Sequence, residues 1–250
     1  MASASKTNPW LVYRAKAAAK LRLFCFPYAG GGARSYQSWD KTLPAAIEVF
    51  AIQYPGREGR LFEEPYSEPR PLVAAIQEAI LPLLDRPFAF SGHSMGGILA
   101  FEVARNLRRD NGLSPVHLFV TGCGDPQRRE ERHTSDLSDA ELIEELKRFN
   151  GAPAEILENL ELMNIMLPYI RADFKVCEKY VYTPEAPLSC PITAVGGLQD
   201  TDVTTERLAG WRRETSGQFS LRMVPGNHFF LQTAQPLILQ TIARTLDRYL

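Results

Sequence analysis

Residues 87–108 read PFAFSGHSMGGILAFEVARNLR, and this stretch decides the fold. The apolar run 87–91 leads into residues 92–96, GHSMG, which match the pattern G-x-S-x-G, and a segment of helical periodicity follows. A strand, a tight turn and a helix in this order lift a serine hydroxyl above the edge of a sheet. Small residues on both sides keep that hydroxyl clear, and Gly92 and Gly96 meet this need. We therefore expect Ser94 to be a nucleophile.

Further apolar runs, rich in aromatic and β-branched residues, lie on both sides of this stretch. They span residues 21–28, 48–54, 117–122, 192–197 and 219–225. Several are apolar at successive positions, which is typical of strands buried on both faces of a parallel sheet. Helical segments separate the runs. The pattern predicts one α/β domain over residues 1–250, with a mostly parallel central sheet flanked by helices.

One part of the chain breaks this alternation. About 70 residues lie between the runs ending at 122 and starting at 192, too many for a single crossover connection. Ser138 and Glu141 predict a capping box at the start of one helix. A second helix is expected to bury a seam formed by Ile156, Leu160, Met163, Leu167, Ile170 and Phe174. Because ligands bind beyond the strand ends in such folds, we expect residues 130–185 to form a helical lid. An ordinary surface helix packed on the core is the alternative.

A nucleophilic serine needs a base, and the base needs an acid that orients it. Of the four histidines, we expect His93 to point away from the Ser94 hydroxyl, His117 to begin a strand and His133 to be solvated. His228 lies between a strand and the last helix and is the candidate base, since the chain order in this type of fold is serine, acid, histidine.

Two carboxylates follow the run 192–197 and can serve as the acid. Asp202 lies nearer the next helix and suits its amino-terminal cap. Asp200 lies nearer the strand and is better placed to accept a hydrogen bond from His228. The spacing favours Asp200 and leaves Asp202 as the alternative.

The reaction also needs backbone N–H donors for a developing oxyanion. In this type of fold the residue after the nucleophile supplies one donor, which is Met95 here. The glycine-rich loop 26–32, FPYAGGG, is the candidate for the other, through Ala29. This loop lacks G-x-G-x-x-G, and the chain has no G-x-x-x-x-G-K-[ST], so a nucleotide site is disfavoured.

Composition narrows the class of protein. The 250 residues are 45% hydrophobic, enough for a sizeable core, and a net charge of −1 offers no field that attracts nucleic acid or an anionic membrane. The four cysteines, which are Cys25, Cys123, Cys177 and Cys190, form no zinc-binding pattern. They are expected to be free thiols in a reducing compartment. With no signal peptide and no membrane span, we expect a cytoplasmic protein without metal or bound cofactor, whose first nine residues form a loose tail.

The sequence resembles the type II thioesterases that accompany modular polyketide synthases and nonribosomal peptide synthetases. The likeness covers nearly the whole chain, through FPYAGGGARSYQSW, YPGREGRLFEEP, FSGHSMGGILAFEVAR, GGLQDTDVTTERLAGWRRETSGQF and PGNHFFL. The resemblance implies an α/β-hydrolase fold and assigns the nucleophile to Ser94, the acid to Asp200 and the base to His228. It also assigns the oxyanion donors to the amides of Ala29 and Met95. The chain departs from the usual pattern at Gln199 and Asn227, beside the acid and the base.

The resemblance implies hydrolysis of acyl thioesters on the phosphopantetheine arm of carrier domains, which clears stalled or aberrant groups from a synthase. Acyl or peptidyl carrier domains are then the partners, and a monomer is expected. The residues expected to bind substrate are Tyr28, Met163, Met166, Phe174 and Phe229, although the two methionines fit packing within the lid equally well. The carrier arm is expected to enter near Arg34, Arg57 or Arg128.

Two other functions stay open at this point. The same triad serves a medium-chain fatty acyl thioesterase or a general carboxylesterase, because fold does not determine substrate. A function of a different, non-enzymatic class is that of an inactive hydrolase fold acting as a docking protein. The intact set of Ser94, Asp200 and His228 argues against it.

Overall fold

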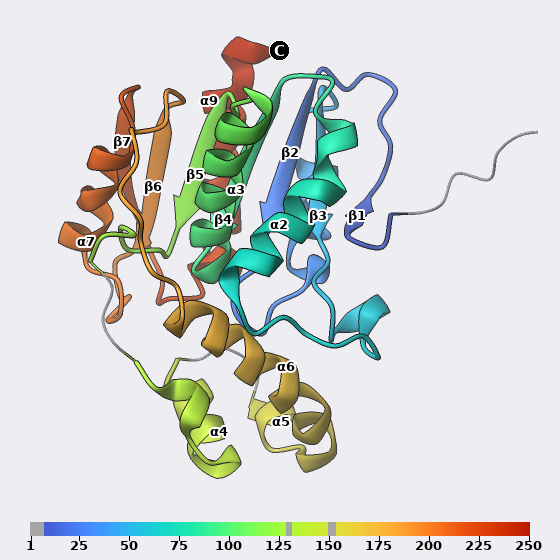
Figure 1. The fold of residues 1–250 in the computed structure, drawn as a ribbon, viewed down its shortest axis with the longest axis vertical. Helices are drawn as coiled ribbons and strands as arrows, with labels where there is room; N and C mark the ends of the chain where they lie inside the picture. Colours follow the sequence, from blue (N-terminus) through green and yellow to red (C-terminus); the bar gives the residue numbers. More distant parts are fainter. Residues whose placement is uncertain (1–7, 129–131, 150–153) are drawn as a thin grey trace, which may run out of the picture.

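The computed structural model describes residues 8–128, 132–149 and 154–250. Its centre is a seven-stranded sheet with the order β1-β3-β2-β4-β5-β6-β7, in which every pairing is parallel except that of β1 with β3 (Figure 1). The strands are β1 Leu11–Tyr13, β2 Leu21–Phe26, β3 Ile47–Ile52, β4 Phe88–His93, β5 His117–Thr121, β6 Ile192–Gly197 and β7 Phe219–Val224. All six predicted strands form. The strand β1 was not predicted, because its apolar run, WLVY, is only four residues long, and Val12 and Tyr13 are exposed.

Helices cover both faces of the sheet. Those outside the segment 130–185 are α1 Trp39–Thr42, α2 Pro69–Ile80, α3 Met95–Asn111, α7 Thr205–Ala209, α8 Phe230–Thr233 and α9 Gln235–Leu246. One apolar cluster packs α2 and α3 on one face, and a second packs α1, α8 and α9 on the other. Short 3₁₀ helices span Ala33–Tyr36, Glu58–Arg60, Leu81–Leu83, Thr134–Asp136, Gly210–Glu214 and Asp247–Tyr249. The expected layered α/β architecture is confirmed.

In its described residues, the segment between β5 and β6 carries the α-helices α4 Asp139–Arg148, α5 Ala154–Leu157 and α6 Leu160–Glu178, which we call the helical insertion. They lie beyond the carboxyl ends of the strands (Figure 1). A separate apolar cluster holds them together, formed by Leu142, Leu157, Met163, Leu167, Tyr169 and Ile170. The predicted capping box is present, since Ser138 and Glu141 bond reciprocally. The expected single helix from Ile156 is wrong: the side chain of Asn159 accepts from the amide of Leu162 and starts a new helix, which leaves Leu160 70% exposed.

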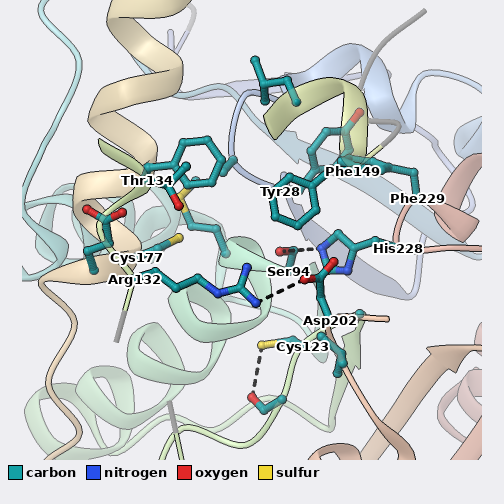
Figure 2. A pocket seen from close by; sticks show the side chains of 18 of the residues that line it. Tyr28, Ser94, Cys123, Arg132, Thr134, Phe149, Cys177, Asp202, His228 and Phe229 are labelled. Atoms are coloured by element: carbon teal, nitrogen blue, oxygen red, sulfur yellow. Dashed lines mark hydrogen bonds and ion pairs between the residues drawn. The ribbon is translucent and has the colours of Figure 1, made fainter. Parts of the chain in front are cut away.

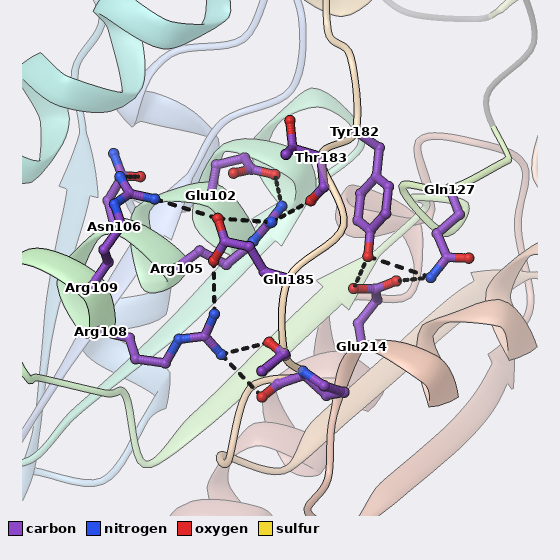
Figure 3. A network of polar contacts seen from close by, with 12 residues as sticks. Glu102, Arg105, Asn106, Arg108, Arg109, Gln127, Tyr182, Thr183, Glu185 and Glu214 are labelled. Atoms are coloured by element: carbon purple, nitrogen blue, oxygen red, sulfur yellow. Dashed lines mark hydrogen bonds and ion pairs between the residues drawn. The ribbon is translucent and has the colours of Figure 1, made fainter.

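The residues just before the insertion and those just after it form polar contacts with the elements that surround the sheet (Figure 3). Gln127 Nε2 and Tyr182 Oη donate to the two carboxylate oxygens of Glu214, over 2.7 and 3.2 Å. Burial raises the pKa of Glu214. On α3, buried Arg105 forms an ion pair with Glu185 over 3.0 Å. The segments before and after the insertion are therefore anchored at Glu214, in the 3₁₀ helix Gly210–Glu214, and the segment after it also at Arg105 on α3.

Three further expectations concern the cysteines, a membrane span and the amino-terminal tail. All four cysteines lie in the described ranges, and none of them forms a disulfide. Among the described helices, none combines the length and the apolar character needed to cross a membrane. Of the expected amino-terminal tail, residues 1–7 lie outside the described part of the chain, whereas Asn8 is anchored by a hydrogen bond from Nδ2 to the carbonyl of Ala79.

Candidate active site

Ser94 stands on the turn between β4 and α3 with φ 52° and ψ −117°, a strained conformation for a residue with a side chain. Its amide donates to the carbonyl of Thr121 on β5 over 2.8 Å, which fixes the turn to the sheet. A Cβ atom at Gly92 would lie 2.1 Å from the carbonyl oxygen of Gly96, and one at Gly96 would lie 2.0 Å from that of Phe26. The two glycines thus allow α3 to pack against β4 and β2, and this close packing, rather than clearance for the hydroxyl alone, requires them.

The structure brings together the three residues expected to form the triad. His228 Nε2 lies 3.0 Å from Ser94 Oγ, and His228 Nδ1 lies 2.9 Å from Asp200 Oδ2 (Figure 2 shows the contact of Ser94 with His228). Ser94 comes from the β4–α3 turn, Asp200 follows β6 and His228 follows β7. The Asp200 side chain is inaccessible to solvent, and that of His228 is 13% exposed. The hydroxyl, imidazole and carboxylate therefore form one chain of hydrogen bonds.

Asp200 is held as an ionised acceptor. Its Oδ1 accepts from the amides of Asp202 and Val203 over 2.9 and 3.1 Å, while Oδ2 faces His228. Burial raises the pKa of Asp200, but the hydrogen bond from His228 and these two amides outweigh burial and keep it below its ordinary value. Because an ionised carboxylate only accepts, His228 carries its proton on Nδ1 and turns the lone pair of Nε2 toward Ser94.

Asp202 has a different environment from the one expected. The cap of α7 is Thr204, whose hydroxyl accepts from the amide of Arg207, so the expectation of Asp202 as the cap is wrong. Asp202 instead lies 3.2 Å from Arg132, as Figure 2 shows, and 3.6 Å from Arg148 at the end of α4. Its side chain faces the insertion rather than His228.

The other three histidines lie where they are expected, and His93 makes one contact that was not predicted. His117 begins β5 and is buried, and His133 is exposed. His93 points away from Ser94, yet its Nε2 lies 2.8 Å from the backbone carbonyl of His228. Since a carbonyl only accepts, Nε2 carries the proton. Burial, and then the neighbouring His228, lower the pKa of His93 to about 3, so it is neutral and supports the turn that carries His228.

The turn around His228 also uses the two residues that depart from the family pattern. Gln199 Oε1 accepts from the amide of Gly226 over 2.6 Å. Asn227 Oδ1 accepts from the amide of Phe229 over 3.0 Å. Both side chains thus serve backbone groups on either side of His228, and neither displaces a triad residue.

Ala29 and Met95 line the same pocket as Ser94. Within the described ranges, no hydrogen-bond acceptor is found for the backbone N–H of either residue. Met95 opens α3, where N–H groups lack partners inside the helix. Both amides are therefore available at the pocket floor, as an oxyanion hole requires.

The pocket lies between the strand ends and the insertion (Figure 2). Of the residues expected to bind substrate, Tyr28, Phe174 and Phe229 line it. Met163 and Met166 are not among the described residues that line it. Both methionines pack in the apolar cluster of the insertion. Their expected contact with substrate is therefore wrong, because the insertion uses them for its own core. Sequence reasoning missed several lining residues, for which no pattern gives a signal: Cys123, Arg132, Thr134, Leu146, Phe149 and Cys177.

Of the three arginines expected near the carrier arm, Arg34 and Arg128 are exposed. Arg57 is buried, with 3% of its side chain exposed, and forms an ion pair with Asp173 of α6. It is therefore no surface residue, and its expected role at the pocket mouth is wrong.

A serine, a histidine and a carboxylate linked in this order at the carboxyl edge of a parallel sheet define a serine hydrolase of the α/β-hydrolase fold. The thioesterase domain family model matches residues 21–248. The chain belongs to this family of thioesterases.

Individual relatives agree with this assignment. The gramicidin S biosynthesis protein GrsT of Aneurinibacillus migulanus is 44% identical over 246 residues, which cover 97% of this chain and 95% of that protein. The structure of the type II thioesterase BorB from the borrelidin biosynthetic cluster has a TM-score of 0.89 and 34% identity, covering 97% of this chain and 99% of BorB. A medium-chain S-acyl fatty acid synthase thioesterase of Rattus norvegicus is 34% identical over 221 residues, covering 85% of this chain and 82% of the rat protein. The resemblance to type II thioesterases is confirmed.

Proposed function

We propose that this thioesterase removes acyl groups from the phosphopantetheine arm of carrier domains in a polyketide or nonribosomal peptide synthase. The observation that carries the proposal is the hydrogen-bonded chain from Ser94 Oγ through His228 to Asp200 at the floor of a partly apolar pocket. The similarity to the gramicidin S biosynthesis protein and to BorB supports the carrier-bound substrate.

Acylation begins when Ser94 Oγ attacks the thioester carbonyl and its proton moves to His228 Nε2, 3.0 Å away. Asp200 keeps His228 in the required tautomer and stabilises the imidazolium that forms. The oxyanion of the tetrahedral intermediate accepts from the amides of Ala29 and Met95. The carbon–sulfur bond then breaks, the pantetheine sulfur takes the proton from His228, and an acyl ester remains on Ser94.

Deacylation repeats these roles with water as the nucleophile. His228 Nε2 takes a proton from a water molecule, whose oxygen attacks the acyl ester held between the same two amides. The ester bond breaks, the proton returns from His228 to Ser94 Oγ, and the carboxylic acid leaves. Each role belongs to a residue at the floor of the pocket.

Residues 130–185 act as the lid of this site in our proposal. Leu146, Phe149 and Phe174, from the chain between β5 and β6, line the pocket together with Tyr28 and Phe229, which supports an acyl chamber formed by both the insertion and the sheet side. The Phe149 and His228 rings lie 6.3 Å apart. Three properties stay predictions: that the protein is a monomer, that it works in the cytoplasm and that a carrier domain is its partner.

The test compares kcat/KM on one acyl group carried by a carrier protein, by an N-acetylcysteamine thioester and by a p-nitrophenyl ester. We expect the carrier protein to be preferred, with Ser94→Ala lower by roughly 10⁴- to 10⁶-fold on all three. Equal efficiency on the three substrates would contradict carrier recognition and favour a general carboxylesterase. Activity retained by Ser94→Ala would contradict the nucleophile.

A second function has one specific observation in its favour, the similarity to the rat medium-chain fatty acid synthase thioesterase. Measurement of kcat/KM across acyl lengths from two to twelve carbons separates the two. A sharp preference for medium fatty acyl chains favours the second function. Turnover by the wild type with any of these substrates excludes an inactive docking protein.

A further inference from the structure

The helical insertion touches the glycine-rich loop 26–32 through a buried ion pair that the triad chemistry does not use. The carboxylate of Asp173, on α6, accepts from both terminal nitrogens of Arg57: Oδ1 from Nη2 over 2.8 Å, and Oδ2 from Nη1. The two side chains are 2% and 3% exposed. Although burial lowers the pKa of Arg57, the adjacent carboxylate raises it above its ordinary value. Arg57 is therefore a cation beside the carboxylate of Asp173.

Arg57 is fixed on every side. Its Nη1 donates to the carbonyl of Gly31 over 3.2 Å, and its Nε donates to the carbonyl of Pro55 over 3.3 Å. Its guanidinium lies 4.7 Å from the ring centroid of Tyr169 on α6. A planar group held by a bidentate carboxylate, two carbonyls and an aromatic ring has one available orientation.

Asp173 also binds the backbone of the loop that carries Ala29. Its Oδ2 accepts from the amide of Gly30 over 2.7 Å. The carbonyl of Tyr28 accepts from the amide of Gly31 over 2.9 Å, and Gly30 has φ 79°, as a type II turn requires at its third position. Asp173 thus holds the N–H group of the central peptide of this turn.

These two bonds fix the direction of the Ala29 amide. The Tyr28 carbonyl points into the turn, and the N–H of a trans peptide points opposite to its carbonyl, so the Ala29 N–H points out of the turn. The next peptide is held through the Gly30 amide by Asp173. Both peptide planes that flank Ala29 are therefore locked, one by the turn and one by α6.

We propose that Asp173, with Arg57 as its counter-ion, is a positioning residue that sets the Ala29 oxyanion donor against Ser94. The proposal rests on the proposed function, in which Ala29 binds the oxyanion. It also assigns the insertion a task beyond covering the pocket, because the residue that holds the oxyanion loop belongs to α6. Arg57 and Asp173 lie about 116 positions apart in the chain, and only the folded insertion brings them together.

Two variants test the proposal. Asp173→Asn keeps the shape but leaves one acceptor for three donors. Arg57→Met with Asp173→Leu removes both charges, so that no unpaired charge is buried and the protein still folds. Misplacement of a transition-state donor by about 1 Å lowers turnover by roughly 100-fold, and we expect a loss of this size in kcat for the double variant and about tenfold for Asp173→Asn. KM changes less than about threefold, since the ground-state carbonyl gains little from the donor.

The decisive readout is an acyl trifluoromethyl ketone, which adds to Ser94 and places a tetrahedral oxyanion where the amides bind it. Its Ki rises by the same factor by which kcat/KM falls if Asp173 positions the oxyanion donor. A residue that only stabilises the fold lowers the melting temperature and leaves kcat and Ki unchanged. That result, in variants shown to be folded by circular dichroism, overturns the proposal.

The matched control is a second Arg–carboxylate pair with little solvent exposure, which lies away from the pocket. Arg22 on β2 and Glu48 on β3 are 3.3 Å apart and nearly buried, at the strand ends opposite the pocket. Glu48→Gln is expected to lower the melting temperature while kcat and Ki stay at the wild-type values. If wild-type protein turns over no acyl-carrier substrate, the proposed function fails. If wild type is active, Ser94→Ala is inactive and the Asp173 variants equal wild type, only this inference fails.

Discussion

The edge of the sheet and the helical insertion are held by different forces. At the sheet edge, backbone hydrogen bonds position the triad: the amide of Ser94 binds β5, and Asp200 accepts two amides of its own loop. The insertion has a small apolar cluster of its own, and Val176 near the end of α6 packs in a core cluster of the sheet. Two of its ion pairs to the sheet side use the buried Asp173 and the more accessible Asp202. The triad is thus held by backbone hydrogen bonds of the sheet edge, whereas the insertion contacts that edge through side chains.

The largest expected effect separates the two aspartates beside the strand β6. Asp200→Ala removes the group that orients His228, and we expect kcat to fall by roughly 10³- to 10⁴-fold. Asp202→Ala removes ion pairs to Arg132 and Arg148 on the insertion side, which are worth about 1 kcal/mol or less at a partly exposed site, so kcat changes less than about threefold. Steady-state kinetics on one thioester checks both.

Asp202→Ala keeps the amide that Asp202 donates to Asp200, whereas Asp200→Ala removes the acceptor of this amide and of the Val203 amide. Asp200→Asn keeps an Oδ1 acceptor for both amides and is therefore the control for loop disorder. The reverse order of effects would show that the acid is misassigned and that the insertion contacts matter more to the chemistry than the sheet edge does.

The same division explains what the sequence could predict. The strands around Ser94 were predictable because successive apolar residues between glycines and prolines indicate buried parallel strands, and G-x-S-x-G has meaning only between a strand and a helix. Asp200 was separable from Asp202 because its distance from the strand end determines what it can reach. Local patterns thus suffice where the backbone itself holds the site.

Long-range side-chain contacts give no such pattern. Asp173 lies on the buried face of α6, three residues after Ile170 and three before Val176, although an acidic residue of an amphipathic helix is usually solvated. Nothing in YPGRE indicates that Arg57 turns inward to meet it. The 4-3-4-3-4 spacing from Ile156 to Phe174 predicted one helix, but Asn159 starts a new one inside it. In the insertion, therefore, periodicity predicts helices correctly but not where they break.

An effect of intermediate size on stability distinguishes the apolar cluster of the insertion from the core between α2 and the sheet. Met163 is buried in the insertion cluster, and Met163→Ala is expected to destabilise that cluster by about 2–5 kcal/mol. Because the cluster is separate from those around the sheet, we expect faster hydrogen exchange and proteolysis in α6 and little change in the strands. Ile76→Ala, in the core between α2 and the sheet, is the matched control and accelerates exchange throughout. Equal acceleration in all elements by Met163→Ala would mean that the insertion and the sheet unfold as one unit.

The smallest expected effect at neutral pH concerns His93, the last residue of β4, which joins the start of the β4–α3 turn to the turn carrying His228. Its pKa is about 3 in the folded protein and about 6.5 in an unfolded chain, so the unfolded chain binds a proton more readily between these values. Stability is therefore complete above about pH 6.5 and declines as the pH falls toward 3, by up to about 1.4 kcal/mol per pH unit. His93→Gln cannot titrate, and urea unfolding between pH 4 and 7 is expected to show a shallower decline.

His117 is the matched control for this measurement, because burial, and then Arg248, lower its pKa to about 4 while it bonds Thr193 rather than any part of the turn at His228. His117→Gln is expected to flatten the acid decline as well, with kcat unchanged. His93→Gln also lowers kcat by a few-fold, since the carbonyl of His228 loses the imidazole that holds it at 2.8 Å. Equal kcat in the two variants would mean that the backbone turn alone positions His228, and that the sheet edge needs even less side-chain support than the geometry indicates.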